Sequence, residues 1–347
     1  MRKIRVCIVT ADLSIGGGQQ VVYELAKNLV GSSVDFEVLC YAGKSESYAD
    51  SKADGLFPIQ YQNFKGKATV QKILGINRAI NEFDPDIVHA HLGGVFYSVI
   101  WALLHHGRIV ITAHTKPSQA FSKRIEPAIR FLLKKKRACI VGVSEENKKA
   151  LEEYFDIHDE RIHCVNNGVD LTRFYRKDHE QYTLINVARQ DENKNQIATI
   201  RCFKMLHRKY PNTKLILLGD GPTHKELIKE AGSLIEDKSV EMPGMVSNTE
   251  DYYAISDVYV QSSHREAMPM SMLEAMAAGL PLISTDVGGV RDIIVDNGII
   301  VPDNDENSLL EAMLQLFECS SDIKRSFSQK SKKIVENYSS AHMANSY

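Results

Sequence analysis

Short apolar runs alternate along this chain with segments in which apolar residues recur every three or four positions. The runs are typical of buried strands, and the wider spacing is typical of helices that bury one face. Strands that alternate with helices predict a parallel sheet covered by helices on both faces. In the first half we expect strands at 3–10, 36–40, 86–90, 108–114, 138–143 and 162–165, and helices at 21–30, 95–104, 124–136 and 146–155.

A second series of the same kind follows a polar and charged segment that ends near residue 181. A helix in this half begins at Pro269 and ends at Gly279, and a short buried strand follows it. The last stretch, 321–346, is polar and has the pattern of a helix. The two series together predict two α/β domains. The other expected elements are strands at 182–188, 214–218, 239–242 and 257–261, and helices at 195–208 and 223–235.

Composition narrows the class of protein. With 347 residues the chain is too long for one typical core, which favours two domains. The net charge of -2 at pH 7 argues against nucleic acid as the main partner. The chain has no long apolar run that would predict a transmembrane helix, and its first residues lack the pattern of a signal peptide. The 6 cysteines are scattered, as is typical of reduced thiols, so we expect a cytoplasmic protein.

Two glutamates frame the start of the helix at Pro269. Glu266 precedes this helix and Glu274 lies about one turn inside it, so both carboxylates can face one cleft. The first turn, at Met270 and Ser271, offers free backbone N–H groups and the positive end of the helix dipole to an anion. A sugar nucleotide, with phosphates in the middle and hydroxyls at both ends, fits this layout. The plainer alternative is an ordinary amphipathic helix with solvated glutamates.

Residues 262–291 resemble the retaining GT-B glycosyltransferases of family four. The resemblance rests on the seven residues between Glu266 and Glu274, on the Met-Ala-x-Gly-x-Pro run at 276–281 and on the Gly-Gly pair at 288–289. One difference is that Ala-Met-Pro follows Glu266, where the family often has Gly-Phe-Gly. Because backbone N–H groups at this place should touch the donor sugar and proline has none, the identity of that sugar stays open.

The resemblance implies a fold and a domain division. The fold is GT-B, with two doubly wound, Rossmann-like parallel-sheet domains that face a cleft. The Asn-Gly-Val-Asp string at 167–170 is similar to the one that ends the first domain in this family. Residues 1–170 would form an N-terminal domain on the acceptor side, and residues 171–320 a C-terminal domain that binds the nucleotide sugar. Residues 321–347 would form a C-terminal helix that could pack back on the first domain.

The resemblance also implies roles for the site residues. Arg189 and Lys194 follow the first strand of the second half and would hold the diphosphate, where fixed cations stabilise the charge that builds on the leaving group. Glu274 would bind the ribose hydroxyls, Glu266 the sugar hydroxyls, and His114 would line the sugar site. The implied catalytic residues are Glu266 and His114, and the implied donor-binding residues are Gly16, Gly17, Arg189, Lys194, Met270, Ser271 and Glu274.

Some of these assignments have plainer alternatives. The glycines at 16–18 follow the first strand, where glycine can simply form a tight turn. Arg189 and Lys194 are also residues that a solvated loop contains, and His114 could be a structural histidine. A dehydrogenase is disfavoured, because a dinucleotide fingerprint would need glycine where Val21 stands.

No metal cofactor is expected. A zinc site of His89, His91 and His114 is conceivable at the strand ends, but no carboxylate or thiolate that would complete it is obvious in the sequence. The Asp-x-Asp strings at 84–86 and 303–305 have the composition of turns. Two basic side chains and a helix dipole already supply the positive charge that a metal would bring.

Residues 121–137 carry many Lys and Arg side chains against a single Glu, with apolar residues along one face. A basic amphipathic helix can lie on an anionic membrane, and it can equally be a surface helix that packs its apolar side on its own sheet. The pattern supports both interpretations equally. Membrane contact through this helix would bring a cytoplasmic enzyme to the inner face of the membrane.

The expected activity is transfer of a hexosyl or N-acetylhexosaminyl group from a nucleotide sugar to an acceptor hydroxyl, with retention at the anomeric carbon. A UDP-linked donor is favoured and a GDP-linked donor is the second option. The acceptor is expected to be a lipid-linked glycan in the assembly of surface polysaccharide or lipopolysaccharide. Two alternatives stay open, a GT-B nucleotide-sugar epimerase and a catalytically silent binding subunit. The presence of Glu266 and Glu274 with Arg189 and Lys194 argues against the silent subunit.

Overall fold

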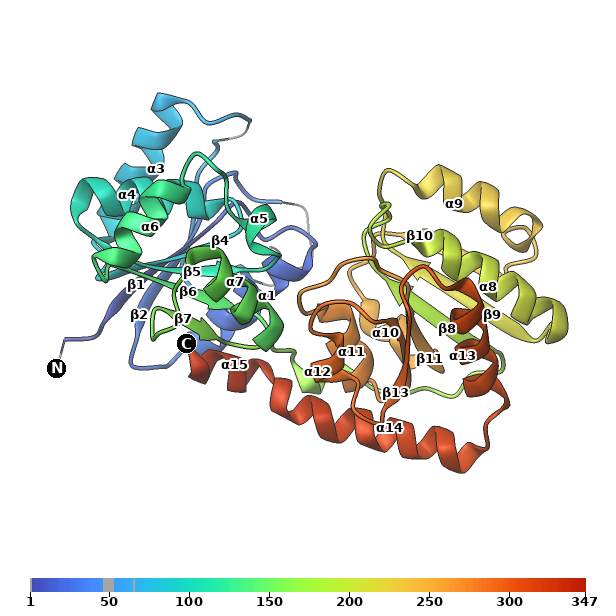
Figure 1. The fold of residues 1–347 in the computed structure, drawn as a ribbon. Helices are drawn as coiled ribbons and strands as arrows, with labels where there is room; N and C mark the ends of the chain where they lie inside the picture. The colour runs from blue at the N-terminus through green and yellow to red at the C-terminus, as the bar shows by residue number, and fades with distance from the viewer. Residues whose placement is uncertain (1, 46–52, 65) are drawn as a thin grey trace. The chain divides into compact units, whose positions relative to one another are not determined.

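The computed structural model describes residues 2–45, 53–64 and 66–347 of the chain. The chain divides into two compact units, the first made of Met1–Gly168 with Ser340–Tyr347, and the second of Val169–Ser339. In each unit a parallel sheet is sandwiched between helices (Figure 1). The prediction of two doubly wound parallel-sheet domains is therefore confirmed.

The sheet of the first unit has the strand order β3-β2-β1-β4-β5-β6-β7. The order reverses between β1 and β4, which pair in parallel with Val9 opposite Ala90. The strands are β1 (Arg5–Thr10), β2 (Asp35–Cys40), β3 (Ile59–Tyr61), β4 (Ile87–His91), β5 (Arg108–Ala113), β6 (Ala138–Gly142) and β7 (Ile162–Cys164). The helices are α1 (Gly17–Leu29), α3 (Val70–Phe83), α4 (Gly94–His105), α5 (Pro117–Ala120), α6 (Glu126–Lys134), α7 (Glu145–Phe155) and α15 (Ser340–Ser346).

The sheet of the second unit has the order β10-β9-β8-β11-β12-β13 and reverses between β8 and β11. The strands are β8 (Tyr182–Val187), β9 (Thr213–Leu218), β10 (Val240–Gly244), β11 (Val258–Gln261), β12 (Leu282–Thr285) and β13 (Gly298–Val301). The α-helices are α8 (Gln196–Lys209), α9 (His224–Ala231), α10 (Thr249–Ala254), α11 (Met270–Ala277), α12 (Val290–Ile293), α13 (Glu306–Glu318) and α14 (Ser321–Val335). Short 3-10 turns lie at Leu171–Arg173, Gly232–Leu234 and Glu336–Tyr338.

These reversals locate the edges where ligands are expected. In open α/β sheets, ligands bind beyond the carboxyl ends of the strands, at the point where the strand order changes direction. In the first unit this point is followed by the loops after β1 and β4, and in the second unit by the loops after β8 and β11. Each unit has its own buried apolar core beneath these loops.

The C-terminal segment is not one continuous helix. Residues 321–346 were expected to be helical throughout, but α14 ends at Val335, a 3-10 turn follows, and Ser339 is extended with ψ 147. Helix α15 then packs on α1 within the first unit, and Met343 accepts a hydrogen bond from the backbone N–H of Gly168 at 3.2 Å. The hydroxyl of Tyr347 lies 3.0 Å from that of Thr112, at the end of β5.

Helix α6 buries the apolar side that the sequence showed. Ile129, Leu132 and Leu133 are fully buried in the core of the first unit. Arg130 pairs with Glu126 on the same helix. The apolar face of α6 is therefore packed within its own domain. Any partner of this segment would contact its exposed Lys and Arg side chains.

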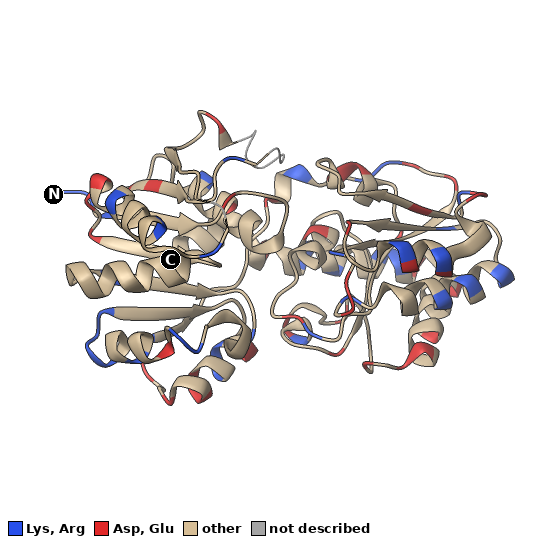
Figure 2. Ribbon diagram, turned by 90° about the horizontal axis from the view of Figure 1, so that it is seen from above, with Lys and Arg blue, Asp and Glu red and all other residues tan. Residues whose placement is uncertain are grey.

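Figure 2 shows Lys and Arg positions and Asp and Glu positions spread over both units, although single helices can carry one sign: α8 has basic and no acidic residues, and α13 has acidic and no basic ones. This distribution agrees with the formal net charge of -2 at pH 7. No helix in the described part of the chain combines the length and the apolar composition that crossing a bilayer requires.

Candidate functional site

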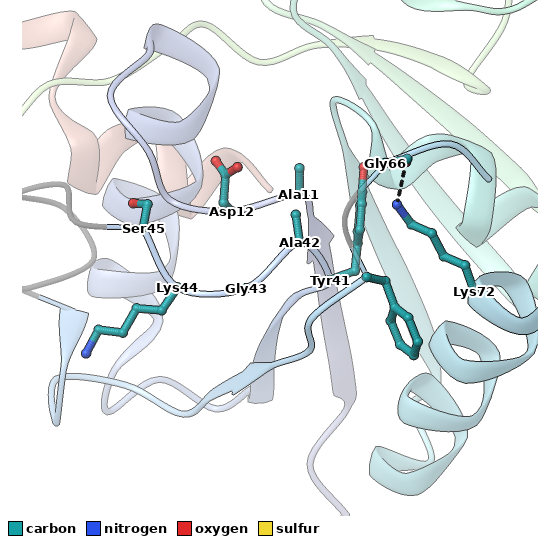
Figure 3. Close-up of a pocket in the computed structure, with 10 residues that line it drawn as sticks. Ala11, Asp12, Tyr41, Ala42, Gly43, Lys44, Ser45, Gly66 and Lys72 are labelled. Carbon is teal, nitrogen blue, oxygen red and sulfur yellow. Dashed lines mark hydrogen bonds between the residues drawn. The ribbon is translucent and has the colours of Figure 1, made fainter. Parts of the chain in front are cut away.

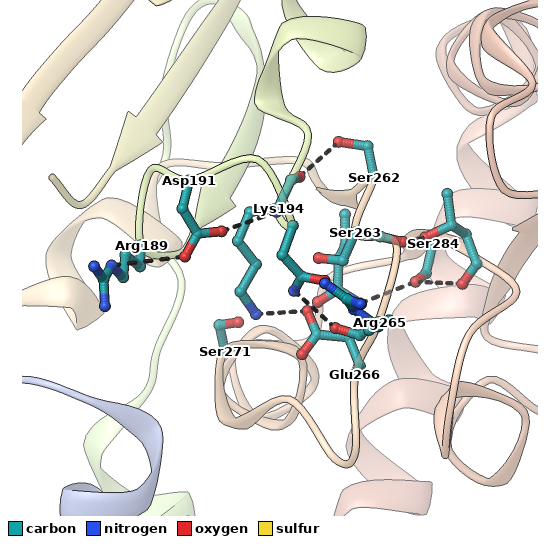
Figure 4. Close-up of polar contacts among 12 residues, drawn as sticks. Arg189, Asp191, Lys194, Ser262, Ser263, Arg265, Glu266, Ser271 and Ser284 are labelled. Carbon is teal, nitrogen blue, oxygen red and sulfur yellow. Dashed lines mark hydrogen bonds and ion pairs between the residues drawn. The ribbon is translucent and has the colours of Figure 1, made fainter. Parts of the chain in front are cut away.

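A buried ion pair joins the two loops at the switch point of the second unit. Lys194 lies in the loop after β8, Glu266 lies in the loop after β11, and Nζ of Lys194 is 2.6 Å from Oε1 of Glu266 (Figure 4). The Glu266 side chain is only 8% exposed. A carboxylate with so little water around it needs a charged partner, and the ammonium of Lys194 provides one.

Hydrogen bonds to backbone carbonyls hold these two loops together. The N–H of His264 donates to the carbonyl of Asn193 at 2.8 Å. The side-chain amide of Asn193 donates to the carbonyl of Arg265 at 3.0 Å, and the Ser262 hydroxyl donates to the carbonyl of Asn195 at 2.8 Å. The residues on either side of Lys194 and Glu266 are thus fixed to each other, which fixes the ion pair between them.

The Gly-Gly pair of the sequence motif packs against the backbone of Glu266. Gly288 has φ +58, and a Cβ atom there would lie 1.9 Å from the carbonyl oxygen of Glu266. The N–H of Gly289 donates to the carbonyl of Ala267 at 3.1 Å. Both the backbone conformation and the close approach require glycine at position 288, so this motif residue acts by positioning the Glu266 loop.

Glu274 lies on α11 and is held by a buried tyrosine. The Tyr253 hydroxyl lies 3.1 Å from Oε2 of Glu274 and 2.9 Å from the carbonyl oxygen of Ser271, and its single proton is shared between these two acceptors. The hydroxyl of Tyr259 lies 2.8 Å from that of Ser271. Burial raises the pKa of both tyrosines, so their hydroxyls stay protonated. Neither tyrosine could be assigned from the sequence, because each precedes its partner by 12 or more residues and follows no motif.

The first turn of α11 begins at Met270, with Pro269 as the residue before it. The first backbone N–H groups of a helix have no partner within the helix, so those of Met270 and Ser271 are available to a ligand. The acidic side chain of Glu274 sits one turn further along the same helix. The expected layout of helix start and second glutamate is therefore present in the structure.

Arg189 is near this site but does not take part in the ion pair. Its side chain is 70% exposed, its Nε is 3.6 Å from Oδ2 of Asp191, and it points away from Lys194 and Glu266 (Figure 4). The structure thus brings Lys194 and Glu266 together and leaves the guanidinium of Arg189 in an extended, solvent-exposed position.

The first unit places three histidines at the ends of neighbouring strands. His91 ends β4 and His114 follows β5, and Nδ1 of His91 lies 3.0 Å from Nε2 of His114. Nε2 of His89 is 2.9 Å from the hydroxyl of Thr112. Burial lowers the pKa of His89 to about 3 and that of His114 to about 4, and it lowers the pKa of His91 well below the usual value. All three imidazoles are therefore neutral at neutral pH.

The residues that the sequence offered as metal ligands make other contacts in the structure. Within the described residues, no group of three His, Cys, Asp or Glu side chains is arranged to hold a metal ion. Asp303 pairs with Nδ1 of His264 at 2.8 Å, and Asp305 accepts a hydrogen bond from the N–H of Ser308 at the start of α13. Asp86 accepts one from the N–H of Arg5. The His264–Asp303 contact could not be inferred from the sequence, because the two residues are 39 positions apart.

The glycine loop of the first unit leads into α1. Gly16 directly precedes this helix and Gly17 begins it. Asp12, after β1, accepts hydrogen bonds from the N–H and the hydroxyl of Ser14, which shape the loop. A Cβ atom on Gly18 would lie 2.9 Å from a methyl group of Leu92, so the first turn of α1 packs closely against the residue that follows β4.

A polar cavity opens beside this loop. It has a volume of about 460 Å³, and its lining includes Asp12, Tyr41, Lys44 and Lys72 (Figure 3). Nζ of Lys72 lies 5.0 Å from the centre of the Tyr41 ring and donates to the carbonyl of Gly66 at 3.1 Å. Burial lowers the pKa of Lys72. The carbonyl and the aromatic ring stabilise the ammonium at this place.

Two family models match the chain, one for each half. Residues 15–173 match Glycosyltransferase Family 4, and residues 170–334 match Glycosyl transferases group 1. A curated relative, an uncharacterized glycosyltransferase of Methanocaldococcus jannaschii, is 31% identical over 256 residues, which are 67% of this chain and 62% of the relative. The chain thus spans about three-fifths of that relative's length. One component of the phosphatidylinositol N-acetylglucosaminyltransferase of Arabidopsis thaliana is 24% identical over 90% of this chain and 74% of its own length.

A solved structure with the same fold is that of Anabaena HepE in complex with UDP and glucose. It matches with a TM-score of 0.84 over 99% of this chain and 98% of its own, at 15% sequence identity. At this identity the match speaks for the fold. It extends over both units, in agreement with the two family models.

The buried histidines predict a specific dependence of stability on pH. An unfolded imidazole takes up a proton below about pH 6.5, whereas the folded ones stay neutral until much lower pH. The unfolded state therefore binds more protons, and the free energy of unfolding should fall as the pH falls from about 6.5 to 4. The loss is at most about 1.4 kcal/mol per pH unit for each histidine. Denaturant unfolding can be followed by the fluorescence of Trp101, a buried residue of the first unit.

Two substitutions of histidine by uncharged glutamine test this explanation of the pH dependence. In His91→Gln the loss of stability between pH 6.5 and 5 should be smaller than in the wild type, because one buried titrating group is gone. In His158→Gln, which changes an exposed histidine of the same unit, the pH dependence should be unchanged. Equal slopes in His91→Gln and the wild type would show that His91 does not titrate as described.

Proposed function

Residues 15–334 of this chain form two glycosyltransferase domains of GT-B fold, and we propose that it transfers a sugar from a nucleotide-sugar donor to an acceptor hydroxyl with retention at the anomeric carbon. The observation that carries the proposal is the Lys194–Glu266 pair at the switch point of the second unit, with Glu274 on the adjacent helix. A cation and two carboxylates next to a helix start suit a ligand with a diphosphate between two sets of hydroxyls.

Each charged group has a distinct role in this proposal. Glu274, fixed by Tyr253, accepts hydrogen bonds from the ribose hydroxyls. Glu266 accepts hydrogen bonds from hydroxyls of the donor sugar. Lys194 bridges Glu266 and the diphosphate, and Arg189 turns its exposed guanidinium to phosphate oxygens. Negative charge builds on the leaving nucleoside diphosphate, so these two cations stabilise the transition state more than the bound donor.

Uncharged groups complete the proposed site. The backbone N–H groups of Met270 and Ser271 bind diphosphate oxygens at the start of α11, and those of Gly16 and Gly17 approach the same group. His114 lines the donor sugar as a neutral imidazole, because burial lowers its pKa to about 4. It can therefore exchange a hydrogen bond with a sugar hydroxyl without adding charge next to the anomeric carbon, where positive charge develops during transfer.

A UDP-linked hexose or N-acetylhexosamine is the favoured donor, and a GDP-linked sugar is the second option. The structurally similar Anabaena protein was crystallised with UDP and glucose. The acceptor we propose is a glycan on a lipid, made during assembly of surface polysaccharide or lipopolysaccharide. In support, the name of the Arabidopsis relative specifies a phosphatidylinositol acceptor.

Two other functions use the same fold. A nucleotide-sugar epimerase would convert the donor with no acceptor present, and a silent subunit would bind a partner enzyme without turnover. The Lys194–Glu266 and Tyr253–Glu274 contacts favour an intact donor site over a silent subunit. Dependence of product formation on an added acceptor separates transfer from epimerisation.

The donor site predicts which ligands stabilise the protein. UDP and UDP-sugars should raise the midpoint of thermal unfolding, because a ligand at about 100 times its Kd stabilises the native state by about 2.7 kcal/mol. Glu274→Gln keeps the size of the side chain but weakens its bond to ribose, so it should reduce this shift. The measurement is a thermal scan of both proteins with a panel of nucleotides and nucleotide sugars. A wild-type midpoint that no member of the panel changes would contradict the proposal.

The proposed diphosphate contacts predict the effect of removing either cation. Arg189→Ala and Lys194→Met should each lower turnover by about two orders of magnitude, the usual cost of a lost charge-stabilising donor. Lys194→Met also leaves Glu266 buried without its cation, whereas the exposed Arg189 can be changed with little effect on folding. Lys204→Met, on the surface of α8, is the matched control and should retain wild-type turnover.

The same assay tests the proposal that no metal is needed. Wild-type transfer should continue in EDTA, because Arg189 and Lys194 supply the positive charge. Normal turnover in a folded Arg189→Ala variant would remove that residue from the site. Loss of wild-type activity in EDTA, restored by manganese or magnesium, would overturn the metal-free assignment.

We also propose that residues 121–137 bring the enzyme to an anionic membrane surface through their charges. The apolar face of α6 is buried in its own domain, so this contact depends on the exposed lysines at 134–136. Each cation near such a surface contributes about 1 kcal/mol, and salt screens it. Replacing residues 134–136 by glutamine should strongly reduce sedimentation with anionic vesicles at low salt.

The control replaces three exposed lysines of the second unit, Lys225, Lys229 and Lys238, and it should sediment like the wild type. Activity on a short soluble acceptor should stay nearly intact in both triple variants. If the wild-type protein stays in the supernatant at every anionic content, the segment serves only the fold.

A further inference from the structure

The first unit contains a second cavity, at the carboxyl ends of β4 and β5. It has a volume of about 660 Å³ and lies beside His114, between the start of α4 and the segment 115–125. This volume is within the range of sites that bind small molecules. All of its lining residues belong to the first unit.

Most of the lining is apolar. Val95, Phe121 and Ile125 form a buried floor that is continuous with the core of the unit. Leu92 and Phe96 are partly exposed and form walls. A cavity of this composition binds an apolar group by removing it and its own walls from water.

The polar lining carries charge of one sign. Lys123 is exposed at the cavity, and no Asp or Glu is among the described residues that line it. The other polar groups are uncharged, including the hydroxyls of Ser118 and Ser122 and the neutral ring of His114. A ligand with a negative charge next to its apolar part therefore fits better than a cationic one.

Leu92 has a backbone conformation that leucine rarely adopts. Its φ of +50 lies in the left-handed region, where a branched side chain is disfavoured. The side chain packs against Gly18 in the first turn of α1, because a Cβ atom there would meet a Leu92 methyl group at 2.9 Å. Residues in such conformations are concentrated at binding sites, where the surrounding structure maintains them. Here the conformation places an apolar wall between the first turn of α1 and the cavity.

We propose that this cavity binds the aglycone of the acceptor, an apolar group attached to an anionic group that pairs with Lys123. The apolar group packs on Leu92 and Phe96, and the acceptor hydroxyl is thereby held near His114. Nε2 of His114 is engaged with His91, which leaves Nδ1 to bond the acceptor. The inference rests on the proposed transferase function and specifies its acceptor as an amphiphilic anion.

The test measures binding to the full chain by calorimetry, with four small probes below their micelle concentrations. Octyl phosphate carries both features, methyl phosphate only the anion, octyl glucoside only the apolar chain, and methyl glucoside neither. Octyl phosphate should bind at least tenfold more tightly than methyl phosphate, because only its chain fills the cavity. Lys123→Gln should weaken octyl phosphate binding about fivefold and leave octyl glucoside binding unchanged, and Lys149→Gln, at an exposed position of α7, is the matched control.

A blocking variant locates the binding. Ser118 is exposed and lines the cavity, so Ser118→Trp should fill it and abolish binding of both octyl probes, while Ser33→Trp at an exposed loop should not. If Ser118→Trp fails to fold by circular dichroism, Gln119→Trp replaces it, since Gln119 is also exposed in the lining. Equal binding of octyl and methyl probes, or octyl binding unaffected by the folded blocking variant, would overturn the inference.

Donor binding is measured on the same samples to keep the two proposals separate. A UDP-dependent thermal shift without discrimination among the four probes would refute the acceptor cavity and leave the donor site standing. Octyl phosphate binding that the blocking variant removes, without any nucleotide shift, would support the cavity and refute the proposed donor site.

Discussion

The ion pair between Lys194 and Glu266 is the contact on which the arrangement of the second unit's ligand edge depends. A carboxylate that is 8% exposed is costly unless a cation accompanies it, and this cation comes from a loop 72 residues away in sequence. The loops can supply it because hydrogen bonds to backbone carbonyls fix them to each other and Gly288 allows a third loop to approach Glu266. Most of the local geometry at this edge therefore serves to orient one carboxylate.

The two switch points of the chain present different electrostatics. In the second unit, Lys194 is paired with Glu266 and its side chain remains partly exposed, so an anionic ligand can bind the same ammonium. In the first unit, His91 is hydrogen-bonded to His114 and His89 to Thr112, and burial keeps all three imidazoles neutral by lowering each pKa. One edge is suited to a highly charged group, and the other to hydroxyls and apolar surface.

The sequence predicted the alternation of strands and helices because buried parallel strands consist of continuous apolar runs. It did not predict β3, which is only half-buried, nor the interruption at Ser339, where local pattern gives no sign of the turn. Glu266, Lys194 and Glu274 could be nominated by resemblance, but their partners could not, since Tyr253 and the Lys194–Glu266 contact depend on tertiary folding. The basic helix shows the same limit, because its pattern cannot say what covers its apolar face.

The first unit is built from two separate stretches of chain, since α15 completes it after the whole second unit has been made. During synthesis, residues up to Gly168 leave the ribosome on the order of ten seconds or more before α15, at the usual elongation rate. During that interval α15 does not yet cover its face of α1, and the hydroxyl of Thr112 lacks its contact with the hydroxyl of Tyr347. The first domain to be synthesised is consequently the last to be finished, and the order of domain completion is the reverse of the order of translation.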